Sequence, residues 1–450
     1  MRQNLLIIFS LLCICQVARA GSFEDFVQLY MENSQDIRLA KLQTQQENTE
    51  LSLRQSTDSL VITAKPIYQS SFDGGENKSL LDSQMTQTFR NGSKLSLSYQ
   101  KNSEKDGFGN NLSQQNFAVG LEQALGKNRF GRLLDLRVRE GRSGLLMMQK
   151  EEELVEIQQC LYGAELYSKM FYQTKRLEIA KQLSLESEKI LTFSKKNYRQ
   201  QIIDEVTFLS AKANVIRSQS FLNLQQVAWD TLHNQIKILL QNQTIEMEEA
   251  PDLFLGSSFM AGSKPASIQE MILKQRIETN NIKKQILIES SKPQIDMAFE
   301  FGTNDYEGFA VDPGMNRYLQ IGVKVSIPVS DPSLIHKKTA LNISDESHRV
   351  NITKLGQNEE VFARKYLKEL DFIETQLELS DEKITLYRSQ IDIGYRQFLN
   401  NKIEFETYLD FQNRLLNEQL NHWDLKKSLW QLQLAAMSWN NSLPHFCVKG

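Results

Sequence analysis

Two stretches of the sequence decide the fold: YRQQIIDEVTF at 198–208 and YRQFLNNKIEF at 395–405. Both open with Tyr-Arg-Gln, and both place a Phe ten residues after the Tyr. Each interrupts a long tract with few helix-breaking residues, from about 133 to 241 and from about 334 to 439. Each stretch is therefore predicted to be the turn of a long helical hairpin.

The second tract carries an apolar seam whose spacing alternates between four and three residues, as in coiled coils. Its members are Tyr366, Leu370, Ile373, Leu377, Ser380, Ile384, Tyr387, Ile391, Gly394 and Phe398. The first tract has a more dilute seam, which favours several helices packed side by side. About 65 residues lead from the preceding strands to each turn, or roughly 100 Å of α-helix.

Segments before each hairpin alternate with period two, which is typical of strands. In the region from about 293 to 328, one face is apolar and is predicted to face lipid: Ile295, Met297, Phe299, Phe301, Leu319, Ile321, Val323 and Val325. The other face carries charges that a water-filled lumen would accept: Asp296, Glu300 and Lys324. Strands of about ten residues suit tilted membrane strands.

The region from about 60 to 125 shows the same alternation in three segments, near 62–72, 95–99 and 117–121. Polar stretches at 101–113 and 302–317 are predicted to be long loops. An ordinary sheet with one face in water is the alternative interpretation of these strands.

The chain is predicted to be an internal duplication. The first repeat spans 21–241 and the second 267–441, joined by a linker or equatorial segment at 242–266 and followed by a tail at 442–450. Each repeat opens with a capping-box-like start, at Ser22 and at Ser267. A Lys-Pro pair then starts the strands in each, at 65–66 and at 292–293.

Residues 1–20 are predicted to be a secretory signal peptide, with a basic start, an apolar stretch too short to span a bilayer and cleavage after Ala20. Only Cys160 and Cys447 then remain. Two cysteines are too few for a disulfide framework, and Cys160 is expected to be a small core residue.

The composition excludes several classes of protein. With 450 residues, 21 Gly and 8 Pro, the chain is neither collagen-like nor a disordered linker. The balance of 52 basic and 55 acidic residues gives no sign of a nucleic-acid partner. The five histidines form no zinc-binding spacing, and no nucleophile motif or phosphate loop is present, so neither an enzyme nor a cofactor is predicted.

The order of these elements resembles the TolC-like outer-membrane efflux protein family. The resemblance covers essentially the whole chain after the signal peptide, and rests on the opening helix at 23–60, the strand entries, the strand-to-helix passages and the two turns. It implies a mixed α and β fold: a trimeric outer-membrane β-barrel continued by a long periplasmic α-helical barrel of coiled-coil hairpins. It further implies an exit duct for a tripartite efflux pump or type I secretion system, partnered by a periplasmic adaptor and an inner-membrane transporter.

The turns depart from the family pattern of an aromatic residue, Gly three positions on and Asp nine positions on. The aromatic residue is kept as Tyr198 and Tyr395, whereas Thr207 and Glu404 stand in place of the Asp. The resemblance implies that these four residues lie at the periplasmic aperture, where Glu404 could form an acidic ring. Glu404 as a solvated helix residue and Tyr395 as a packing aromatic are the plainer interpretations.

A second class of function stays open on the sequence. A secreted or periplasmic coiled-coil scaffold or adhesin without a pore would share the long hairpins and the export signal. The leading prediction is the outer-membrane duct, because the alternating strands occur together with the duplicated hairpins.

Overall fold

The computed structural model describes residues 22–56, 60–69, 78–105, 111–241, 267–307, 316–327, 332–400, 402–439 and 444–447. The predicted signal peptide with cleavage after Ala20, the linker 242–266 and most of the C-terminal tail lie outside these residues. The chain separates into two compact units. The helical unit comprises residues 1–40, 152–268 and 354–450, and the sheet unit comprises 41–151 and 269–353.

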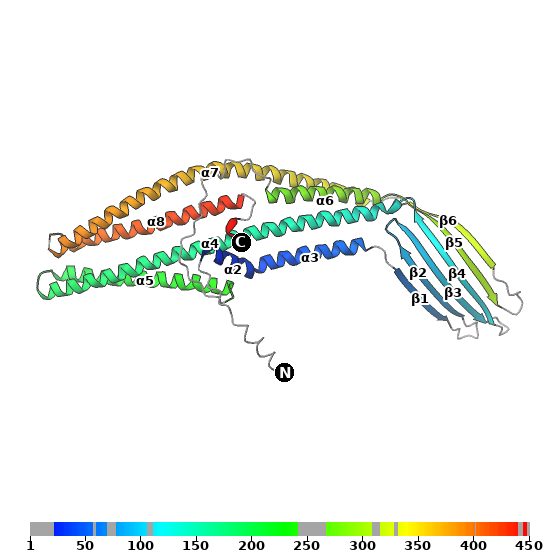
Figure 1. Cartoon of the computed structure of the whole chain (residues 1–450), viewed down its shortest axis with the longest axis horizontal. Helices are drawn as coiled ribbons and strands as arrows, with labels where there is room; N and C mark the ends of the chain where they lie inside the picture. Colours follow the sequence, from blue (N-terminus) through cyan, green and yellow to red (C-terminus); the bar gives the residue numbers. More distant parts are fainter. Residues whose placement is uncertain are drawn as a thin grey trace, which may run out of the picture. The chain divides into compact units, whose positions relative to one another are not determined.

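The long helices have matched lengths. Helices α4 (Arg132–Arg199) and α7 (Pro332–Leu399) contain 68 residues each, and α5 (Glu205–Leu239) and α8 (Phe405–Trp439) contain 35 each. In the helical unit α4 turns into α5 and α7 turns into α8 (Figure 1). The prediction of two helical hairpins with turns in these two stretches is confirmed.

Three shorter α-helices complete the α-helices of the described chain. Helix α2 (Phe23–Asn33) begins with the predicted capping box, in which the Asp25 N–H donates to Ser22 Oγ and the Ser22 N–H donates to the Asp25 carboxylate. Helix α3 (Gln35–Gln55) follows after a break at Ser34. Helix α6 (Ile268–Ser290) precedes the second group of strands. The opening helix predicted for 23–60 is therefore two helices, and it ends earlier.

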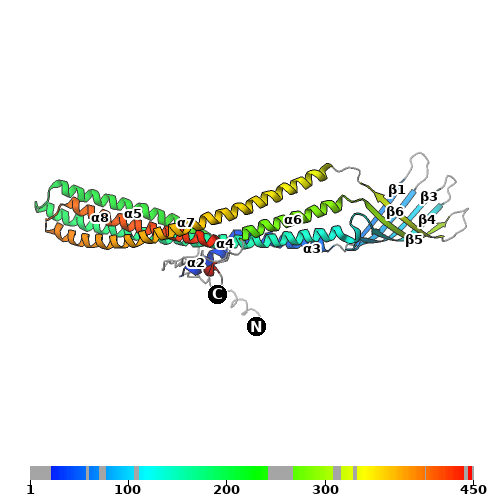
Figure 2. The same cartoon turned by 90° about the horizontal axis from the view of Figure 1, so that it is seen from above.

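The helical unit has an aromatic core where α2, α4, α5 and α8 meet. Phe26, Tyr167 and Leu240 are fully buried there, and Phe171 packs edge-on against Trp430. The predicted seam of α7 supplies a second cluster, in which Tyr366 and Leu370 pack against Leu432 and Ala436 of α8. In Figure 2 the four long helices lie together along the part of this unit that contains the turns. Burial of these narrow stripes stabilises the bundle, at about 25 cal/mol for each Å² of apolar surface removed from water.

All six strands form one antiparallel sheet in chain order, β1-β2-β3-β4-β5-β6 (Figure 1). The strands are β1 (Leu60–Gln69), β2 (Lys78–Thr88), β3 (Ser93–Lys105), β4 (Asn111–Ala124), β5 (Gln294–Glu307) and β6 (Asn316–Ser326). The first region therefore has four strands where the sequence predicted three. The missed strand, β2, contains Leu80 and Leu81 side by side, which breaks the period-two pattern.

The strands also run further than predicted, because β3 and β4 take up much of the loop expected at 101–113 and β5 takes up part of the one expected at 302–317. The two Lys-Pro pairs are not equivalent. Pro66 lies inside β1, opposite Leu81, whereas Pro293 directly precedes β5. Proline is tolerated in β1 because edge strands can spare a backbone N–H.

Across the residues that the structure describes, no helix is both long enough and apolar enough to pass through a membrane.

Candidate functional site

The backbone register of the sheet separates its two faces. One row crosses all six strands as Ile62, Met85, Leu97, Val119, Phe301 and Leu319. The next row on the same face is Leu60, Gln87, Leu95, Leu121, Phe299 and Ile321. These side chains make a largely apolar band, and many of its members are exposed in the single chain.

The opposite face is mostly polar or small. One of its rows is Thr63, Gln84, Ser98, Ala118, Gly302 and Tyr318, and another is Val61, Thr86, Ser96, Gly120, Glu300 and Gln320. Small residues recur where side chains are close. A Cβ added at Gly302 would lie 2.5 Å from the phenol ring of Tyr318. This face therefore presents hydroxyls, amides and a few charges.

The structure groups the residues that the sequence singled out in β5 and β6. The eight predicted lipid-facing residues occupy one face as four opposed pairs, including Phe299 with Ile321 and Met297 with Val323. The three predicted lumen residues share the other face, where Asp296 is directly opposite Lys324. Glu300 accepts a hydrogen bond of 2.7 Å from the Tyr318 hydroxyl.

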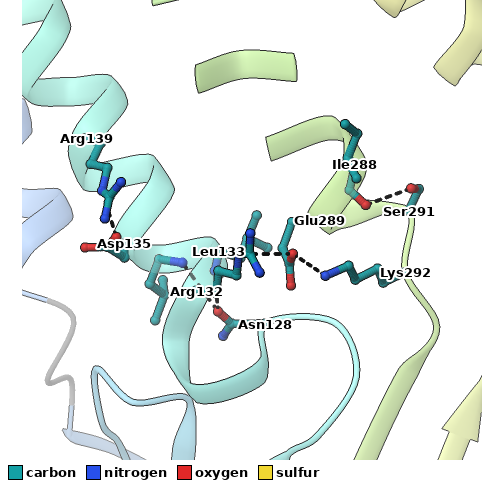
Figure 3. Close-up of polar contacts among 10 residues, drawn as sticks. Asn128, Arg132, Leu133, Asp135, Arg139, Ile288, Glu289, Ser291 and Lys292 are labelled. Atoms are coloured by element: carbon teal, nitrogen blue, oxygen red, sulfur yellow. Dashed lines mark hydrogen bonds and ion pairs between the residues drawn. The ribbon is translucent and has the colours of Figure 1, made fainter. Parts of the chain in front are cut away.

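A compact junction of backbone and polar side chains joins the sheet to the helices (Figure 3). The Asn128 side chain accepts hydrogen bonds from the N–H groups of Leu133 and Leu134, so it caps the first turn of α4. The buried carboxylate of Glu289, at the end of α6, contacts Lys292 at 2.7 Å and Arg132 at 3.7 Å. Ion pairs to one buried acid thus join the start of α4 to the end of α6.

Glycines let the turn between β2 and β3 approach this junction. Gly131 has φ +78°, and a Cβ there would lie 2.0 Å from the Arg90 carbonyl oxygen. Gly92 has φ +79°, and a Cβ there would lie 3.0 Å from the Asn128 carbonyl oxygen. Gly126 similarly approaches Pro293. At Gly131 and Gly92, only glycine combines the left-handed backbone conformation with these contacts.

Polar contacts hold the helices of the sheet unit together. Ser143 of α4 hydrogen-bonds Thr279 of α6 at 2.7 Å. Helix α6 also contacts α7, where the buried carboxylate of Asp345 accepts hydrogen bonds from Asn280 and Lys284. Burial opposes ionisation of Asp345, but the hydrogen bonds from Lys284 and Asn280 outweigh it and lower the pKa of Asp345.

We expect this pairing to make the sheet unit sensitive to acid. Folding lowers the pKa of Asp345 below its ordinary value of 3.8. The pairing therefore contributes stability above that pH, and the contribution is lost as the pH falls below it. Asp345→Asn should cost about 1–2 kcal/mol at neutral pH and should flatten the fall of melting temperature below pH 4. Thermal unfolding across pH 3–7 measures both effects.

The control is Asp135→Asn, which removes an ion pair with Arg139 on an exposed helix surface. Such a pair contributes little to stability, so this variant should follow the wild-type curve. Equal acid sensitivity of Asp345→Asn and wild type would contradict the assignment.

The two hairpin turns meet around a groove of about 580 Å³ in the helical unit. It is lined by residues of both turns, among them Ile202, Asp204, Thr207, Lys402, Glu404 and Glu406. Both turns combine exposed apolar side chains with acids. Burial of Tyr408 in the nearby cluster of Phe398 and Phe405 raises its pKa above the normal range, so it stays a neutral packing residue.

Asp204 is the acid of the first turn, and the sequence comparison of the two turns missed it. Asp204 directly precedes α5 and accepts a hydrogen bond of 2.9 Å from the Thr207 N–H. Hydrogen bonds from Thr207 lower the pKa of Asp204. Because α4 and α7 end at Arg199 and Leu399, Asp204 corresponds to Glu404, which directly precedes α8.

Aligning the two turns by their Tyr-Arg-Gln triplets therefore misaligns them by three residues. Thr207 is not the counterpart of Glu404, and Tyr198 corresponds to Phe398 rather than to Tyr395. Tyr198 stacks on Phe208 with ring centroids 5.1 Å apart, and Tyr395 lies 5.9 Å from Tyr408. Thr207 is half-buried and Glu404 is exposed. All four predicted aperture residues thus lie at or beside the turns.

The two remaining cysteines form a disulfide that the sequence analysis did not anticipate. Cys160 of α4 is fully buried, as expected, but it is bonded to Cys447. Within the described ranges, no group of three or more His, Cys, Asp or Glu side chains could hold a metal ion.

The sequence matches no described protein family, and no curated protein matches it either. Solved structures of outer-membrane channels do share its fold. CmeC from Campylobacter jejuni has a TM-score of 0.70 and 12% identity, covering 93% of this chain and 86% of its own. VceC from Vibrio cholerae has a TM-score of 0.68 and 12% identity, covering 93% and 97%.

MtrE from Neisseria gonorrhoeae, solved in its open state, has a TM-score of 0.61 and 11% identity, covering 93% of this chain and 87% of its own. At these identities the likeness concerns the fold. The resemblance predicted from the duplicated hairpins and strands is confirmed at that level: this chain has the fold of the TolC-like outer-membrane channels.

Proposed function

We propose that this protein is the protomer of a homotrimeric outer-membrane exit duct. The observation that carries the proposal is the two-faced sheet, whose largely apolar rows cross every strand while the opposite rows, apart from Val61, are polar or small. An apolar outer face suits lipid, and a polar inner face suits a water-filled lumen. The eight apolar residues of β5 and β6 would then contact lipid, and Asp296, Glu300 and Lys324 would line the lumen.

The long hairpins would continue the duct through the periplasm as a helical barrel. A 68-residue helix is roughly 100 Å long. At the turns, exposed apolar residues such as Ile202 and Val206 beside acids offer a surface for a periplasmic adaptor. An inner-membrane transporter would deliver cargo to that adaptor, as in an efflux pump or a type I secretion system. Transport through the duct itself would be passive.

Bilayer recording tests the duct against the scaffold or adhesin alternative. The protein purified from outer membranes should give discrete conductance steps in a planar bilayer. A scaffold without a pore should give none, and recovery as a soluble periplasmic monomer would rule out the duct.

The acids at the turns should influence ion selectivity if the turns form the inner aperture. Three copies would bring six acids together, from Asp204 and Glu404. A unit charge about 8 Å away in water is worth about 0.5 kcal/mol. A trimer of Glu404→Gln loses three such charges, so its cation-to-anion permeability ratio should fall by at least about twofold. Asp204→Asn with Glu404→Gln should lower it further. Reversal potentials in a salt gradient measure the ratio.

Glu382→Gln is the matched control, because Glu382 is an exposed glutamate within α7 and away from the turn. It should leave the reversal potential unchanged. If the double variant at the turns behaves like this control, the acids do not line the conduction path.

A further inference from the structure

We propose that β1 of one copy pairs with β6 of the next, so that three copies close a barrel of eighteen strands. The inference rests on the proposed trimeric duct and adds the seam and the size of the barrel to it. It makes the hairpin of β1 and β2 part of the barrel wall. The competing arrangement leaves this hairpin outside, pairs β3 with β6 of the next copy and gives twelve strands.

Both edges of the sheet need partners. Within the described chain, β1 pairs only with β2 and β6 pairs only with β5. Each edge strand therefore presents a row of free backbone N–H and C=O groups on one side. In hydrocarbon each such group costs several kcal/mol, so an open edge is not tolerated there. Some other strand must cover both edges if this sheet enters a membrane.

Strand direction makes the two edges complementary. Every neighbouring pair in the sheet is antiparallel. With six strands, β6 runs opposite to β1, so a seam between β6 and the β1 of an identical chain is antiparallel as well. An odd number of strands would force a parallel seam. Copies of this chain can therefore continue the same ladder without a change of pattern.

Two rows of the hairpin of β1 and β2 continue the faces of the other four strands, although Val61 and the opposed pair of Ile67 and Leu80 put apolar side chains on its polar face. Ile62 begins the apolar row that ends at Leu319, and these edge residues are 71% and 68% exposed. Thr63 and Gln84 begin the polar row that ends at Tyr318. A hairpin that folded over the sheet would not need a lipid-type face and a lumen-type face in phase with the other four strands.

Pro66 limits where the seam can form. It lacks a backbone N–H, so the ladder loses one donor at that position. Residues 60–65, nearest to α3, keep all their donors and carry exposed Leu60, Val61 and Ile62. The seam should therefore be tightest in the half of β1 next to the helices.

The number of strands also determines whether the barrel is wide enough to enclose a channel. A barrel of eight strands is just wide enough to be filled by its own side chains, so one six-stranded sheet cannot close around an open lumen. Barrels of sixteen to eighteen strands enclose an aqueous channel. Including the hairpin of β1 and β2 therefore gives a lumen of the porin size class.

Cysteine crosslinking in outer membranes distinguishes the two seams. Ile62→Cys is combined in turn with Leu319→Cys, Ile321→Cys and Val323→Cys in one chain, because the stagger between copies is not fixed by symmetry. All four positions lie on the apolar face. After mild oxidation, at least one combination should give covalent dimers and trimers on a denaturing gel without reductant.

Two further sets complete the design. Leu97→Cys with the same three β6 positions tests the twelve-stranded seam and should give no covalent oligomer. Leu97→Cys with Val119→Cys, which are opposed within one sheet, should crosslink inside the chain without forming oligomers. Both cysteines of the native disulfide are buried. Bilayer conductance is recorded for every oxidised sample.

Covalent trimers through β1 and β6 support the inference. Covalent trimers through β3 and β6 in a conducting sample overturn it while leaving the proposed duct intact. Crosslinking through β1 and β6 that stops at dimers overturns the three-copy barrel. Absence of both oligomers and conductance contradicts the proposed function as well.

Discussion

Gly131→Ala should destabilise the sheet unit by about 3–5 kcal/mol, through left-handed backbone strain together with a steric clash. Gly131 has φ +78°, and the added Cβ would lie 2.0 Å from the Arg90 carbonyl oxygen. That oxygen belongs to the backbone, so a side-chain rotation cannot relieve the contact. The turn between β2 and β3 would have to move away from the start of α4.

The measurement is thermal unfolding in detergent, followed by far-ultraviolet circular dichroism, together with the yield of protein in the outer membrane. Both should fall sharply for Gly131→Ala. Gly322→Ala in β6 is the matched control, because a Cβ there meets no atom within 4 Å. Gly356→Ala in α7 also meets nothing and should stabilise its helix by about 0.5–1 kcal/mol. Wild-type stability of Gly131→Ala would show that the turn and the helix are not interlocked.

Much of the architecture can be predicted from the sequence because its elements are long and periodic. The α7 seam predicted from the spacing of Tyr366, Leu370 and Ile373 is buried against α8, as expected. The alternation in β5 and β6 places the apolar residues on one face, because the strand period is two. A pattern repeated over many residues tolerates a local exception.

The sequence-based predictions fail where the structure depends on one local contact or on a contact between residues far apart in the sequence. The two turns were aligned three residues out of step because three residues are close to one helical turn, so either alignment keeps apolar residues on the same face. The contact that settles the register is the hydrogen bond from the Thr207 N–H to Asp204. Strand β2 was missed because its adjacent leucines break the alternation. Glu289 was missed because its partner Arg132 comes from a distant part of the chain.

Opening the disulfide between Cys160 and Cys447 should have the largest effect on the helical unit. The two residues are separated by 287 positions, and their Cα atoms lie 6.0 Å apart. Closing so long a loop in the unfolded chain is worth about 6 kcal/mol in the chain-entropy model. The bond also fixes the short helix η3 (His445–Cys447), whose Phe446 ring lies 5.0 Å from that of Phe23 in α2.

We therefore expect reductant to lower the melting temperature of the wild-type protein markedly. The double variant Cys160→Ala with Cys447→Ala should melt near the reduced wild type, apart from a small cavity at the fully buried position 160. Reductant should not affect this variant, which separates loss of the bond from loss of packing. A gel-mobility difference between reduced and non-reduced wild type reports the bond directly.

Formation of this bond also depends on where the chain folds. Disulfides persist in oxidising compartments such as the bacterial periplasm and are rare in the cytosol. Protein exported through the predicted signal peptide should carry the bond, whereas protein made without residues 1–20 should retain two thiols that react with a maleimide after unfolding. Two free thiols in the exported protein as well would contradict the bond. The aromatic core would then hold η3 by packing alone, and reductant should leave the melting temperature unchanged.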